Sequence, residues 1–213
     1  RDSTVIQPNK YAALAAGIIA EKGLPWNEAR SEILESNPHL STSMLPSDEQ
    51  IETALREHYA IFDPEGHKER LRELRLMALT VMKELEQYSP LLTKGVLNGC
   101  ADKFSNIYID LAADDPKEVE LFLLDRNIDF ESYPVEARTK RDPVEELVVE
   151  APSLRNGVLR DQHISVWVVL RVYDARQPGK KKQNKLPDRW QIEEESFKFA
   201  TIEDLAKILD KTK

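Results

Sequence analysis

The sequence predicts an α+β protein, in which a helical domain over residues 1–90 precedes a small α/β domain with a mixed sheet over residues 91–213. Two observations predict this organisation. Apolar residues recur at helical spacing before Pro90, whereas they alternate with polar residues at strand spacing after it. A chain of 213 residues is also long enough to build a helical domain beside an α/β domain.

Four amphipathic helices are expected in the first ninety positions, because apolar residues gather on one face in each of four segments. Stop and start signals separate these segments. A glycine and prolines end or begin helices, and a Ser-x-x-Gln capping box opens the third one. The residues that mark these ends are Gly23, Pro25, Pro38, Ser47, Gln50 and Pro90.

The α/β domain is expected to hold several strands and two helices. Its strongest strand is HISVWVVLRVYD, residues 163–174, which is mostly apolar on both faces and should therefore lie centrally in the sheet. Asp115-Pro116 opens one helix, and Thr201 caps a second one at the end of the chain. The other expected strands cover residues 96–97, 107–111, 130–137 and 146–151.

Composition narrows the functional classes. No apolar run approaches the roughly 20 residues that span a bilayer, and no signal peptide is visible. The single cysteine, Cys100, cannot form an internal disulfide, which fits a cytoplasmic protein. The net charge of −8 disfavours nucleic acid as a partner, because that binding rests on neutralising phosphates.

The stretch VLNGCADKFSNIYIDL, residues 96–111, reads as a strand, a turn and a second strand. It resembles the nucleotidyltransferase fold of the DNA polymerase beta superfamily. In that family a Gly-Ser turn cradles nucleotide phosphates, and alternating carboxylates on the next strand hold two metal ions. The resemblance covers about eighty residues, from Gly95 to Asp174, a length that suits one small sheet.

The resemblance implies a site that has lost most of its acids. Gly99 and Cys100 take the positions of the Gly-Ser turn. In one register Asn106 and Tyr108 replace both carboxylates, whereas a shift of two residues keeps Asp110 as the second acid. The implied ligand-binding residues are Asn98, Gly99, Cys100, Ser105, Asn106 and Tyr108, with Asp110 as catalytic residue and metal ligand.

The implied cofactor is a single Mg²⁺, held by Asp110 and ligand phosphates. A further acid would come from a later strand, and Glu131, Glu136 and Glu150 are equal candidates. Asp110 is as readily read as a solvent-facing strand acid. Cys100 is read as a small buried residue rather than a nucleophile. His163 begins the strongest strand and is placed to reach a site at the end of the sheet.

Two functional hypotheses follow. The first is a catalytically degenerate, nucleotidyltransferase-like protein that binds a nucleotide or another phosphate-bearing ligand. The alternative is a non-enzymatic protein-interaction module, in which the helical domain docks a protein partner. The first requires a cleft with acids from a second strand, and the alternative requires an exposed apolar patch on the helices.

Overall fold

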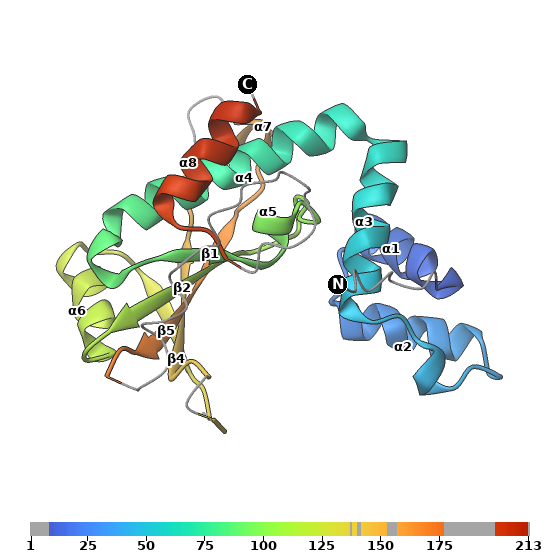
Figure 1. Ribbon diagram of the computed structural model, residues 1–213, viewed down its shortest axis with the longest axis horizontal. Helices are drawn as coiled ribbons and strands as arrows, with labels where there is room; N and C mark the ends of the chain where they lie inside the picture. Colours follow the sequence, from blue (N-terminus) through green and yellow to red (C-terminus); the bar gives the residue numbers. More distant parts are fainter. Residues whose placement is uncertain (1–8, 137, 140–141, 153–156, 177–198, 213) are drawn as a thin grey trace, which may run out of the picture. The chain divides into compact units, whose positions relative to one another are not determined.

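The computed structural model describes residues 9–136, 138–139, 142–152, 157–176 and 199–212 (Figure 1). The chain forms two compact units, Arg1–Glu69 and Arg70–Lys213. The predicted order is confirmed, since the N-terminal helices precede a five-stranded mixed sheet with interspersed helices. Within the described residues, none of the helices combines the length and the apolar character needed to span a bilayer.

The first unit is a small helical bundle. Three small residues of its first helix, Ala12, Ala15 and Ala16, are buried with Ile33 and Leu55, so neighbouring helices approach closely. The capping box of Ser47 and Gln50 is present as predicted. The helices of this unit are α1 (Lys10–Lys22), α2 (Trp26–Ser36), the 3-10 helix η1 (Thr42–Met44), α3 (Asp48–Phe62) and the beginning of α4 (Pro64–Glu84).

The second unit is built on one mixed sheet. Its strands follow the order β1-β2-β5-β4-β3, in which β2 and β5 are parallel and the other neighbours are antiparallel. The central position of β5 agrees with its apolar sequence. The strands are β1 (Leu91–Thr93), β2 (Ile107–Ala113), β3 (Phe130–Pro134), β4 (Glu145–Glu150) and β5 (Trp167–Asp174).

Helices pack on one face of this sheet. Ile109 of β2 and Leu170 of β5 are fully buried in a core that also contains Met82 of α4 and Leu205 of α8. In the view of Figure 1, α4 and α8 lie above the strands. The remaining helices of the unit are η2 (Glu86–Tyr88), α5 (Lys94–Asn98), α6 (Lys117–Asp125), α7 (Val158–Asp161) and α8 (Ile202–Lys211). The opposite face of the sheet, called the outer face below, carries the polar residues of β2 and β5.

The prediction of a strand at residues 96–97 is wrong. Val96 and Leu97 belong to α5, and the strand before the turn is β1, which ends at Thr93. Lys94 has a φ of 59°, so the chain turns directly after β1 and places Val96 and Leu97 in the core as helical residues. Gly99, with a φ of 86°, then ends α5 in the left-handed conformation that glycine adopts easily.

The division between the units falls inside α4 rather than at residue 90. From Arg70 onward, α4 belongs to the second unit. Leu74, Ala78 and Met82 lie in the sheet core and are fully buried. Helical periodicity shows that α4 has an apolar face, but it does not show which core that face covers.

Candidate functional site

The outer face of the sheet brings together the polar residues of β2 and β5. Along β2, Tyr108 and Asp110 are half-buried and alternate with core residues, so both side chains lie on the outer face. Because β2 and β5 are parallel and in register, Asp110 lies opposite Arg171. The sequence therefore predicts the shared face of Tyr108 and Asp110, and the sheet adds an arginine to it.

Asp110 is held in an ion pair. Arg171 Nε donates to Asp110 Oδ1 over 2.6 Å, and Arg171 Nη2 donates to Thr93 Oγ1 over 3.2 Å. One guanidinium thus links β1, β2 and β5. Burial, the largest single contribution, lowers the pKa of Arg171, but the charge of Asp110, the hydrogen bond to it and the nearby Tyr173 and Glu146 together outweigh burial, so the pKa is raised. Burial, reinforced by Asp110, also raises the pKa of Tyr173 to about 12, so this phenol keeps its proton.

Two cations lie near the ring of Tyr108. The ammonium nitrogen of Lys94 is 3.9 Å from the ring centroid, and the guanidinium carbon of Arg171 is 6.0 Å from it. Lys94 reaches the ring because it directly follows β1, whose last residue pairs with Tyr108. Cations over an aromatic face are attracted by the ring quadrupole. We call Lys94, Tyr108, Asp110 and Arg171 the outer-face cluster.

In the turn at residues 98–100, which was predicted to bind phosphate, the backbone N–H groups donate to acceptors within α5. The backbone N–H groups of Gly99 and Ala101 both donate to the carbonyl of Gly95, over 3.0 and 3.1 Å. The N–H of Cys100 donates to Asn98 Oδ1 over 3.3 Å, and its thiol donates to the same oxygen over 2.9 Å. Cys100 is only 5% exposed, as expected for a small buried residue. These bonds stabilise the end of α5 and leave few donors for a phosphate.

Ser105 and Asn106 lie just before β2. The Ser105 hydroxyl accepts from the N–H of Asp102 over 3.0 Å and lies 3.3 Å from its carboxylate. The same carboxylate accepts from the N–H of Phe104 over 2.8 Å. Asp102 is buried and fixes this turn, a role for which the sequence pattern gives no distinct signal. Ser105 therefore shapes the entry to β2.

The residues of the outer-face cluster do not fit a two-metal centre. Tyr108 and Asn106 supply no carboxylate, and Asp110 pairs with a fixed cation. Among the described residues, no three or more His, Cys, Asp or Glu side chains are grouped so that they could hold a metal ion. The single Mg²⁺ at Asp110 therefore stays a prediction.

The three candidate acids lie on the far side of the sheet from β2. Glu131 is on β3, Glu136 follows that strand, and Glu150 ends β4. Because β5 separates β2 from β4, and β3 lies beyond β4, none of them is on a strand next to Asp110. The residue of β4 that lies opposite Arg171 is Glu146, which sequence reasoning did not single out.

No protein-family model, no curated protein and no solved structure matches this chain. The resemblance to nucleotidyltransferases thus depends on the residues of the 96–111 stretch alone.

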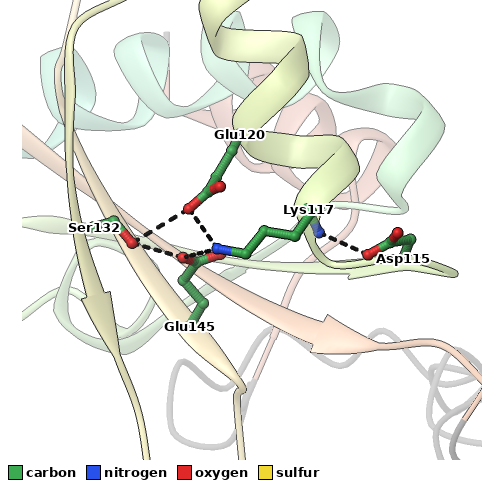
Figure 2. A network of polar contacts seen from close by, with 5 residues as sticks. All are labelled: Asp115, Lys117, Glu120, Ser132 and Glu145. Carbon is green, nitrogen blue, oxygen red and sulfur yellow. Dashed lines mark hydrogen bonds and ion pairs between the residues drawn. The ribbon is translucent and has the colours of Figure 1, made fainter.

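A second polar network joins α6 to the edge of the sheet (Figure 2). Lys117 Nζ lies 2.8 Å from Glu120 Oε1 and 3.2 Å from Glu145 Oε1. Ser132 of β3 donates to the same Glu145 oxygen over 2.6 Å. Asp115 accepts from the backbone N–H of Lys117 at the start of the helix. Because the ammonium already lies between the two carboxylates, we interpret this network as a structural link rather than a binding site.

This link predicts a dependence of stability on pH. The hydrogen bond with Glu145, followed by that with Lys117, lowers the pKa of Glu120 below its ordinary value of 4.5. Ionised Glu120 therefore stabilises the fold above that value, and the contribution is lost as the pH falls through the lower folded-state pKa. We expect Glu120→Gln to flatten the acid limb of the curve of unfolding free energy against pH, measured by urea titration.

Glu118→Gln is the matched control for this prediction, because Glu118 is exposed on the same helix. It should leave the acid limb as in the wild type. An acid limb that is equally steep in Glu120→Gln and in the wild type would show that ionised Glu120 does not contribute to the unfolding free energy.

Proposed function

We propose that the second unit binds a nucleotide or another phosphate-bearing ligand on the outer face of its sheet, without metal-dependent transfer. The observation that supports this proposal most is the placement of Lys94 and Arg171 around the ring of Tyr108. Two cations beside one half-exposed aromatic ring suit a ligand that combines a flat base with a phosphate.

Arg171 is oriented for such a ligand before the ligand arrives. Asp110 and Thr93 each accept one of its five N–H donors, which fixes the plane of the guanidinium. A guanidinium fixed in this way loses little side-chain entropy on binding. Lys94, exposed at the end of β1, adds a second positive charge. A base would stack on the Tyr108 ring by displacing the Lys94 ammonium from the ring face, and the freed ammonium would then pair with the phosphate.

The same ion pair argues against catalysis. Arg171 lies beside the only carboxylate that β2 offers to the outer face. The Arg171 guanidinium would repel a divalent cation at Asp110. This repulsion is strong because the two groups are close together and half-buried, so that solvent screens their charges incompletely. Arg171 thus supplies the positive charge that a metal ion supplies in an active transferase. The proposed ligand would be bound and not converted.

A thermal-shift panel with ATP, GTP, CTP and UTP tests this proposal. A nucleotide at about 100 times its Kd should stabilise the unit by about 2.7 kcal/mol. Lys94→Gly, which suits the positive φ and removes the charge, and Tyr108→Leu should each reduce the shift. Lys103→Ala is the control, because Lys103 also lies over a ring, that of Phe104, but outside the cluster. Absence of a shift with every nucleotide, and also with inorganic phosphate and pyrophosphate, would refute the proposal.

The alternative, a protein-interaction module, has one observation in its favour. Ile61 and Phe62, at the end of α3, are each 72% exposed. Neighbouring exposed apolar residues of this size are typical of surfaces that contact another protein. A nucleotide panel without any shift would make this alternative the better hypothesis.

A further inference from the structure

A cavity of about 260 Å³ opens where β4 ends and β5 begins. Its apolar part is small and includes the buried residues Met77 and Val166. Its rim is polar and carries Glu150, Arg160, His163 and Ser165, all of which are exposed. None of these residues belongs to the outer-face cluster. The cavity is therefore mainly polar, with groups of several chemical kinds beside a small apolar part.

The turn at His163 presents its imidazole to this rim. His163 has a φ of 54° and follows α7. Its N–H donates to the carbonyl of Arg160 over 2.9 Å, and the N–H of Ile164 donates to the carbonyl of Leu159 over 2.8 Å. This pair of bonds is a Schellman motif, in which glycine is the usual residue at the left-handed position. Histidine is strained in this left-handed conformation, whereas glycine would not be. In exchange, the position adds an imidazole to the rim.

A buried carboxylate anchors the same segment to α4. Glu73, only 6% exposed, accepts the N–H of Leu159 over 3.1 Å. Gly157 lies against this carboxylate so closely that a Cβ atom at its position would come within 1.9 Å of Glu73 Oε1. The backbone that carries Arg160 and His163 is thus held by α4. A rim fixed in this way loses little entropy when it binds a ligand.

We propose that this cavity binds a small oxyanion, a carboxylate or phosphate group on a compact apolar body. Arg160 would pair with the oxyanion through its planar guanidinium, and His163 and Ser165 would donate further hydrogen bonds to it. The exposed Glu150 carboxylate of the same rim opposes the oxyanion, so the ligand would sit on the Arg160 side of the cavity. Met77 and Val166 would contact the apolar body. The volume lies below the range of about 300–1,000 Å³ that is typical of drug-sized ligands, which limits the ligand to a small molecule.

Histidine NMR on the full chain tests this proposal with two probes, inorganic phosphate and butyrate. The imidazole signals of His163 should shift saturably with at least one probe, and the probe that binds more tightly identifies the oxyanion. His39, exposed in the first unit, is the internal control and should not respond. A His163 signal that does not saturate, or that moves together with His39, would show a general salt effect and overturn the proposal.

Two variants separate binding from folding. Arg160→Ala should weaken the apparent affinity at His163 by about tenfold or more. His163→Gly relieves the left-handed backbone, so the free protein should melt at a higher temperature, yet the stabilisation by the probe should be lost. An Arg160→Ala protein that binds as tightly as the wild type would contradict the proposed role of the guanidinium.

Discussion

Replacing Arg171 by methionine is expected to lower the unfolding free energy of the second unit by about 2–3 kcal/mol. The substitution removes the neutralising cation from the Asp110 carboxylate, whose side chain is only 21% exposed. Thr93 loses a donor in the same step. Urea unfolding followed by tryptophan fluorescence measures this effect, since Trp167 lies in β5.

The double variant Asp110→Leu with Arg171→Met should recover most of that loss, because well-packed apolar residues often replace an ion pair at little cost. Arg176→Met is the matched control. Its pair with Asp174 spans 3.3 Å, and the Arg176 side chain is 66% exposed, so its removal should cost at most about 1 kcal/mol. Equal losses of unfolding free energy in Arg171→Met and Arg176→Met would show that the half-buried pair of Arg171 with Asp110 stabilises the fold no more than an exposed pair does.

Gly157→Ala is expected to destabilise the second unit by a similar amount, about 2–3 kcal/mol. The new methyl group would occupy the place of a Glu73 carboxylate oxygen, at 1.9 Å. Glu73 would have to move, and its bond to the N–H of Leu159 would break. The same urea titration measures the change in unfolding free energy.

Gly95→Ala provides the control in the same unit. A Cβ at Gly95 would meet its nearest neighbours, including Ala101 and Cys100, at 3.4 Å, which is close to an ordinary contact. Its effect should therefore be small, within about 1 kcal/mol. A Gly157→Ala protein as stable as Gly95→Ala would mean that Glu73 moves aside without cost, and that it does not anchor the segment.

Periodicity predicted the parts of the fold that are long enough to show it. The four N-terminal helices and the central strand β5 each contain several repeats of their apolar pattern. Strand β1 has three residues, too few for any period, and the turn after it uses Lys94 in a conformation for which sequence gives no signal. That is why α5 was mistaken for a strand.

The candidate site was predictable only within one strand. Alternation along β2 places Tyr108 and Asp110 on the same face, whichever register of the family motif applies. Arg171 is 61 residues away from Asp110, and only the register between β2 and β5 makes them partners. Alternation along residues 163–174 does assign Arg171 and Tyr173 to a common face. It does not show that this face is shared with Asp110.

If Arg171 takes the place of a metal ion beside Asp110, as we propose, ligand binding should not depend on Mg²⁺. The most direct measurement is the Kd of the nucleotide with the largest thermal shift, determined by calorimetry in EDTA and again in millimolar Mg²⁺. The two values should agree within about twofold, a difference of less than about 0.5 kcal/mol. Binding that tightens about tenfold or more with Mg²⁺, and loses this gain in Asp110→Asn, would contradict the claim.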